Sequence, residues 1–126
     1  MSELTRISKG DITATIDSMG AQLMSLTCAG GEYLWQGDPK FWPRRAPVLF
    51  PIVGCLKNDE AMSAQGPVRL KRHGLARTNE HEVKEVTTDS VTYELRSSEA
   101  TRELYPYDFC LNMAYSVDGT SLTQSF

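Results

Sequence analysis

Length, composition and charge describe a small globular protein. The chain has 126 residues, which suits one domain and is long enough to bury a core of its own. Hydrophobic residues make up 40% of the chain and charged residues 23%, so the composition does not indicate disorder. The net charge of −3 argues against nucleic acid as a general partner, because a phosphate backbone needs a positive protein face.

The sequence shows no signal for export or membrane insertion. The opening residues MSELTRISKG lack the basic and then apolar layout of a signal peptide, and no apolar run approaches the length that spans a bilayer. The three cysteines, Cys28, Cys55 and Cys110, lie far apart and without metal-ligand spacing, so we expect reduced, partly buried thiols and no metal site. These features predict a cytoplasmic protein without a membrane partner.

Alternation of apolar and polar residues dominates the chain and predicts strands. In chain order, we expect strands at residues 12–17, 22–28, 32–35, 82–87, 91–96 and 109–117. Turn signals separate them at Gly30-Gly31, at residues 88–90 and at Asp118-Gly119. Residues 98–104 form the one helical turn, which Pro106 stops. The fold class is therefore all-β, with antiparallel hairpins.

A further strand is expected to begin at Ser121 and to run to Phe126. Ending on an aromatic residue, it would leave an unprotected sheet edge, which natural sheets tend to avoid. We therefore expect a truncated piece of a larger sheet protein, whose exposed edge also favours a homodimer. The alternative is a short last strand packed against its hairpin partner.

Two segments combine basic residues with apolar sequence, RRAPVLFPIVG at residues 44–54 and RHGLAR at residues 72–77. Arginines beside an apolar run need a carboxylate, a phosphate or several hydroxyls as partners, and histidine exchanges protons near neutral pH. The two segments therefore predict a polar pocket for a small molecule. The alternative is a solvated basic loop formed by Arg69, Lys71, Arg72, His73 and Arg77.

These segments, with GAQL at residues 20–23, EYLWQGDPKFW at residues 32–42 and YPYDF at residues 105–109, resemble the aldose 1-epimerase (galactose mutarotase) family in its bacterial aldose 1-epimerase-like branch. The resemblance implies an antiparallel β-sandwich of the galactose mutarotase-like supersandwich type. Residues 1–126 would be the N-terminal portion of one such domain, because family members are more than twice as long. It also implies a sugar substrate, with no metal and no organic cofactor.

The family interconverts the α and β anomers of an aldose by acid/base ring opening. By resemblance, His73 matches a catalytic histidine that contacts the sugar near its ring oxygen, and Arg45 and Arg77 match substrate-binding arginines. Since Arg44 and Arg45 cannot both face the pocket in an extended segment, the resemblance favours Arg45. The second histidine and the catalytic glutamate belong to later segments of the family, and Cys55 stands where an arginine often follows PIVG.

Other candidate residues have structural interpretations. Trp35 and Trp42 could stack on a sugar, although core packing is the commoner role of tryptophan. His81 is expected to be structural or exposed, and residues 105–109 to pack at a corner of the sandwich.

Three functions remain open. The first is an aldose 1-epimerase-like isomerase. The second is a hexose 6-phosphate epimerase, which the basic residues favour. The third is a truncated carbohydrate-binding fragment without catalysis.

Overall fold

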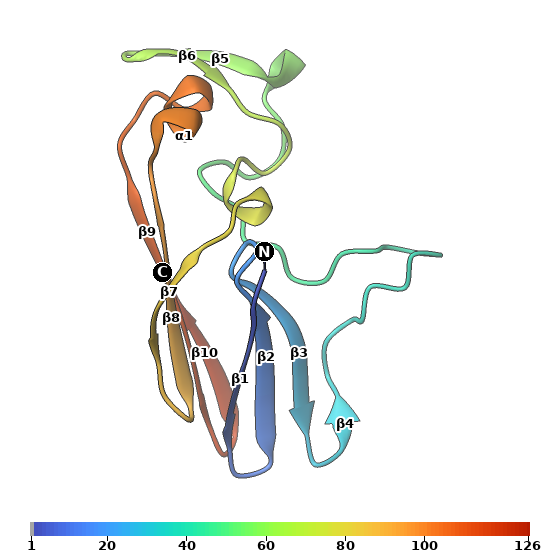
Figure 1. Ribbon diagram of the computed structural model, residues 1–126. Coiled ribbons are helices and arrows are strands. Elements are labelled where there is room, and N and C mark those ends of the chain that lie inside the picture. Colours follow the sequence, from blue (N-terminus) through green and yellow to red (C-terminus); the bar gives the residue numbers. More distant parts are fainter. Residues whose placement is uncertain (1) are drawn as a thin grey trace.

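Two antiparallel four-stranded sheets form the body of the protein in the computed structural model, which describes residues 2–126 (Figure 1). The first sheet has the order β1-β2-β3-β4, with β1 Leu4–Lys9, β2 Ile12–Asp17, β3 Gln22–Cys28 and β4 Gly31–Glu32. The second has the order β10-β9-β8-β7, with β7 Glu82–Val86, β8 Ser90–Arg96, β9 Cys110–Asp118 and β10 Ser121–Ser125. The prediction of an all-β antiparallel fold is confirmed.

Smaller elements lie between and beside the sheets. A separate hairpin pairs β5 (Glu60–Ser63) with β6 (Gly66–Arg69), and single 3₁₀ turns occupy Lys57–Asp59 and Ala76–Thr78. The predicted helical turn is α1 (Glu99–Leu104), between β8 and β9. Ser98 caps it by accepting a hydrogen bond from the backbone N–H of Thr101, whose side chain caps Ser98 in return.

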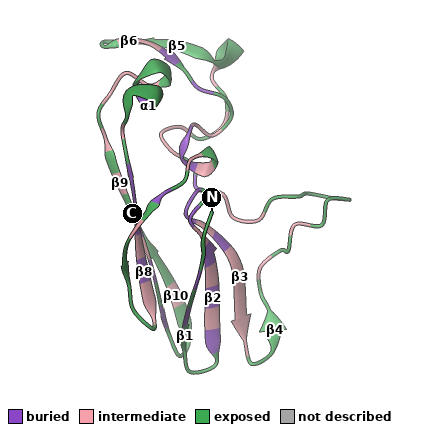
Figure 2. Cartoon of the chain, in the orientation of Figure 1, coloured by how far each residue is buried: buried purple, intermediate pink, exposed green. Residues whose placement is uncertain are grey.

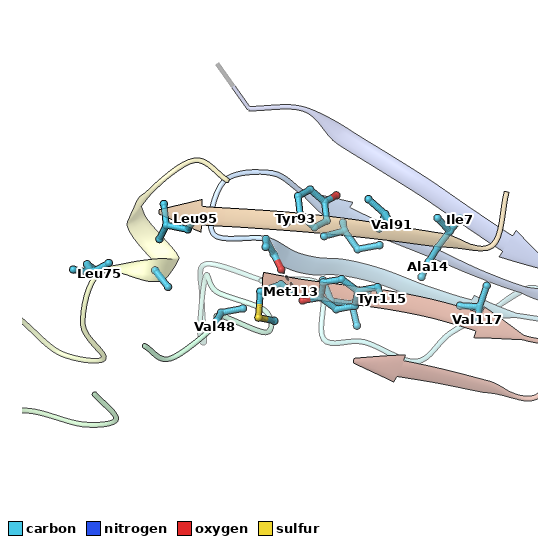
Figure 3. Close-up of a cluster of buried hydrophobic side chains, with 14 of the residues drawn as sticks. Ile7, Ala14, Val48, Leu75, Val91, Tyr93, Leu95, Met113, Tyr115 and Val117 are labelled. Atoms are coloured by element: carbon cyan, nitrogen blue, oxygen red, sulfur yellow. Dashed lines mark hydrogen bonds between the residues drawn. The ribbon is translucent and has the colours of Figure 1, made fainter. Parts of the chain in front are cut away.

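The core lies between the two sheets, where the alternating side chains of facing strands meet. Strand β2 alternates buried and half-buried positions along its whole length, whereas β4 and β10 are mostly exposed (Figure 2). Figure 3 shows the buried side chains Ile7, Ala14, Val91, Tyr93, Met113, Tyr115 and Val117. Tyr115 also joins the sheets, because its hydroxyl donates a 2.6 Å hydrogen bond to the carbonyl oxygen of Ala21.

The aromatic corner predicted at residues 105–109 is present. The rings of Tyr105 and Phe109 pack at a centroid distance of 6.2 Å, and Phe109 contacts Phe50 at 5.1 Å. Tyr105, Phe109 and Phe50 all pack against the buried core. This corner therefore links the start of β9 to the segment that precedes the candidate site.

The strand predicted at residues 32–35 is wrong beyond Glu32. The carboxylate of Glu32 accepts hydrogen bonds from the hydroxyl of Ser25 and from the backbone N–H groups of Leu26 (2.8 Å) and Leu34 (3.1 Å), so the chain turns at this residue. These bonds also lower the pKa of Glu32, against the opposing effect of its partial burial. Residues 33–46, here called the arm, then run out to one side of the sheets (Figure 1).

Two expectations about side-chain burial are also corrected. Trp35 and Trp42 lie in the arm and are exposed, so neither belongs to the core. Cys55 and Cys110 are exposed as well, while Cys28 is half-buried, and all three are free thiols. No helix in residues 2–126 is long and apolar enough to cross a membrane.

Candidate functional site

His73 lies in the turn that follows β6, held by backbone contacts to the apolar segment before it. Its N–H donates to the carbonyl oxygen of Gly54 (2.8 Å), and its own carbonyl oxygen accepts from the N–H of Phe50 (3.2 Å). The backbone of His73 adopts φ 66°, in the left-handed region that a residue with a Cβ seldom occupies. The two segments singled out in the sequence are thus bonded to each other at this histidine.

The imidazole of His73 has a defined tautomer. The N–H of Gly54 donates a 2.9 Å hydrogen bond to Nδ1, so Nδ1 carries no proton and Nε2 does. Burial lowers the pKa of His73, and the nearby charges of Arg77, Arg72 and Arg44 lower it further. The ring is therefore neutral at pH 7 and presents Nε2–H as a hydrogen-bond donor.

Arg77 is the second predicted site residue and is half-buried in the 3₁₀ turn after His73. Its Nη2 donates to the carbonyl oxygen of Arg72 at 3.0 Å, while its buried Nε has no hydrogen-bond partner in the described chain. Burial lowers the pKa of Arg77, and the charges of Arg44 and Arg72 add to this effect. Within residues 2–126, Arg44, Arg72 and Arg77 make no salt bridge.

A cavity of about 380 Å³ lies beside Arg77. Leu70, Leu75 and Leu104 give it an apolar lining, and Asp59 is its one acidic lining residue. The cavity's basic lining residues are Arg69, Lys71, Arg72 and Arg77. Such a surface offers several N–H donors to a hydroxyl-rich or anionic ligand.

Arg45, the third predicted site residue, bonds to backbone carbonyl groups of β3 and of the arm. One N–H of Nη1 donates to the carbonyl oxygen of Met24 and one of Nη2 to that of Gln36, both at 3.1 Å. Arg45 therefore ties the arm to β3, and each of its terminal nitrogens keeps a second N–H. Its neighbour Arg44 was expected to face solvent. In the structure, the charge of Arg44 contributes to the lowered pKa of both His73 and Arg77.

The site lacks a carboxylate partner for the histidine. No hydrogen bond or ion pair within residues 2–126 joins an aspartate or glutamate to His73. No group of three or more His, Cys, Asp or Glu side chains in the described chain is arranged to hold a metal ion. The described residues around His73 thus supply hydrogen-bond donors and positive charge, and the one carboxylate that lines the cavity is that of Asp59.

His81 is buried, with 2% of its surface exposed, and so is structural. Its backbone N–H donates to the carbonyl oxygen of Ser18 (2.8 Å), and its Nδ1 donates to that of Asn79 (3.0 Å). Nε2 is buried without a hydrogen-bond partner in the described residues, and burial lowers the pKa of His81. The nearby carboxylates of Glu3, Glu80 and Glu82 line an adjoining surface hollow.

We expect His81 to make the fold acid-sensitive. Because its pKa is lower in the folded chain than the ordinary value of about 6.5, the unfolded chain binds the proton more readily. The free energy of unfolding should therefore fall as pH drops below about 6.5. Urea unfolding at several pH values measures this slope, which should be smaller in His81→Leu; an unchanged slope would contradict the assignment.

Comparisons with known proteins place this architecture among galactose mutarotase-like β-sandwiches. The galactose mutarotase related enzyme from Lactobacillus acidophilus is 36% identical with a TM-score of 0.93, and the match covers 97% of this chain and 41% of that one. A galactose mutarotase-like protein from Lactobacillus casei is 28% identical with a TM-score of 0.92, over 97% of this chain and 42% of that one.

Sequence comparison identifies the family. The family described as aldose 1-epimerase matches residues 3–126, and the chain belongs to it. The plasmid-encoded protein LacX of Lactococcus lactis is 36% identical over 121 residues, which is 91% of this chain. The chain spans 40% of the length of that relative.

Proposed function

We propose that this chain supplies one wall of a sugar site, in a protein that interconverts the α and β anomers of an aldose. The observation that carries the proposal is the orientation of His73, whose Nδ1 is occupied by the N–H of Gly54 while Nε2–H is free to donate. Membership of the aldose 1-epimerase family supports a sugar as the ligand.

In this proposal His73 donates a hydrogen bond from Nε2 to the sugar near its ring oxygen. A neutral imidazole suits that role, because the three nearby arginines oppose a fourth positive charge. Arg77 and Arg44 donate to sugar hydroxyls, and the remaining N–H groups of Arg45 do so from the base of the arm. Ring opening also needs a base to take the anomeric proton, and this base comes from outside the described wall.

Polarimetry of freshly dissolved α-galactose and α-glucose, together with binding measurements, tests whether this chain binds the sugar without supplying the base. We expect the 126-residue chain to bind sugar and to accelerate anomer exchange weakly or not at all, and His73→Gln to weaken binding about tenfold. Exchange well above the buffer rate that disappears in His73→Gln would mean that the chain is a complete catalyst. A wild-type chain that binds neither sugar would overturn the sugar site itself. Binding without catalysis in the complete protein would favour a carbohydrate-binding role.

A second candidate is a hexose 6-phosphate epimerase. It is favoured by Arg44, Arg72 and Arg77, which make no salt bridge within residues 2–126, and by the Nε of Arg77, which has no hydrogen-bond partner there. A phosphate would neutralise these cations, so its binding should weaken steeply with salt, whereas binding of a neutral sugar should not. Calorimetric titration with glucose and glucose 6-phosphate at two salt concentrations separates the candidates. Equal affinity for both ligands, insensitive to salt, would exclude the phosphate.

A further inference from the structure

The cavity beside Arg77 differs from the wall that presents His73. Its lining comes from the 3₁₀ turn before β5, the end of β6 and the residues after it, the 3₁₀ turn of Arg77 and the end of α1, which lies beside β6 (Figure 1). His73 does not line it, although the neighbouring residues Arg72 and Gly74 do. The cavity therefore offers a ligand a surface other than the imidazole.

Leucine side chains give this cavity an apolar lining. Leu70 and Leu75 belong to the hydrophobic core, which holds them in place. Leu104, the last residue of α1, lines the same cavity and is still 45% exposed. A ligand with an apolar body would remove Leu104 from water, which is favourable. The volume of about 380 Å³ suits a small molecule.

Positive charge exceeds negative charge around the cavity. Of the four basic lining residues, Arg69 has a carboxylate partner, Glu60, at 3.8 Å. The other three make no salt bridge within residues 2–126, namely Lys71, Arg72 and Arg77. They outnumber the single acidic lining residue, Asp59. The lining thus carries positive charge that the described chain does not neutralise.

The guanidinium group of Arg77 shows this lack of neutralisation most clearly. Its Nε is buried without a hydrogen-bond partner in the described residues, and the charges of Arg44 and Arg72 lie close enough to lower its pKa further than burial alone. A partly buried cation among other cations is costly unless a negative charge lies nearby. An anion bound beside Arg77 would supply that charge.

The polar groups of the lining donate more hydrogen bonds than they accept. Arginine and lysine side chains have no acceptor. The side chains of Thr78 and Asn79 both donate to the carbonyl oxygen of Leu75, at 3.2 Å and 2.7 Å, and so are held by the turn. Sugar hydroxyls need acceptors as well as donors, whereas a carboxylate only accepts. The lining therefore favours an anionic group over an uncharged sugar.

We propose that this cavity binds a small organic anion with an apolar body, a medium-chain carboxylate in its simplest form, as a ligand other than the sugar at His73. The apolar body lies against the three leucines, and Arg72 and Arg77 hold the anionic group. The proposal needs no sugar chemistry. It meets the proposed function at Arg77 alone, so an occupied cavity should weaken sugar binding.

Calorimetric titration of the 126-residue chain with octanoate, inorganic phosphate and 1-octanol tests both parts of the ligand. We expect octanoate to bind at one site, at least about tenfold more tightly than either other probe, and more weakly as salt is added. Phosphate bound as tightly as octanoate would mean that the apolar lining contributes nothing. Octanol bound as tightly would mean the same of the cations. Either result, or no binding of octanoate, would overturn the proposal.

Matched variants place the ligand in the cavity. Arg72→Gln should weaken octanoate binding about tenfold and Leu104→Ser at least about fivefold, with thermal unfolding unchanged. The controls are Arg6→Gln and Leu4→Ser, which alter exposed side chains of β1 outside the lining and should bind octanoate as the wild type does. Equal binding by all four variants would contradict the cavity as the site.

Titration with galactose separates this inference from the proposed function. A chain that binds octanoate and no sugar would count against the proposed function and leave the cavity assignment standing. A chain that binds sugar and no octanoate would overturn the cavity assignment alone.

Discussion

Gly74→Ala is expected to lower the free energy of unfolding by about 3 kcal/mol or more. A Cβ atom at this position would lie 2.3 Å from the carbonyl oxygen of Phe50 and 2.6 Å from its carbonyl carbon. Both are backbone atoms that no rotamer change can move, and the backbone of Gly74 also has φ +78°. Alanine would therefore push apart the segment that contains Phe50 and the turn that contains His73.

Urea unfolding followed by circular dichroism measures this effect. Gly119→Ala is the matched control, because a Cβ there meets nothing within 4 Å, and its stability should change by less than about 0.5 kcal/mol. Gly74→Ala should also remove the bond from the N–H of Gly54 to Nδ1 of His73, and with it the defined tautomer. Equal stability of the two variants would contradict the close approach of Gly74 to Phe50.

Tyr115→Phe is expected to cost about 1–3 kcal/mol, because it leaves a buried carbonyl without its donor. The hydroxyl of Tyr115 donates to the carbonyl oxygen of Ala21 and accepts from Nε2 of Gln124 at 2.9 Å. Burial is the main cause of the raised pKa of Tyr115, so the hydroxyl stays protonated and able to donate. The bond connects β9 of one sheet to the turn before β3 of the other.

Thermal unfolding of Tyr115→Phe beside Tyr33→Phe isolates the contribution of this hydroxyl. Tyr33 is exposed, so removing its hydroxyl should leave the midpoint unchanged. If the two variants unfold at the same temperature as the wild type, the link between the sheets contributes nothing to stability.

Strands that face the core on alternate residues were predictable from sequence, and β2, β8 and β9 are where that pattern is clearest. Strand β1 escaped the prediction, because it points Thr5 and Ile7 inward and the apolar Leu4 outward, which hides the alternation. The β5–β6 hairpin escaped for a different reason. It lies largely on the surface and contains Pro67, so it lacks both the apolar period and the composition of a strand.

The candidate site was predictable in its residue types and less so in its geometry. The sequence singles out His73 and Arg77, and the structure places them close enough for the charge of Arg77 to lower the pKa of His73. The hydrogen bonds of Arg45 were not predictable, because only the folded arm brings the carbonyl groups of Met24 and Gln36 to its guanidinium group. Likewise, no sequence signal marks the N–H of Gly54 as the partner of Nδ1.

The assignment of residues 1–126 to the N-terminal portion of one sandwich domain stays a prediction, as does the homodimer. Both predictions concern the edge of the second sheet. Strand β10 forms an edge of its sheet, and an edge strand accepts either a continuation of the fold or another copy of itself.

The central claim is that His73 faces a sugar through Nε2, and nuclear magnetic resonance of the two histidines tests it most directly. The chain contains His73 and His81 alone, so the ring signals of each can be assigned and His81 serves as an internal reference. Addition of galactose or glucose should shift the ring signals of His73 in a saturable manner and leave those of the buried His81 unchanged. Signals of His73 that do not respond to either sugar, or a response confined to His81, would contradict the account.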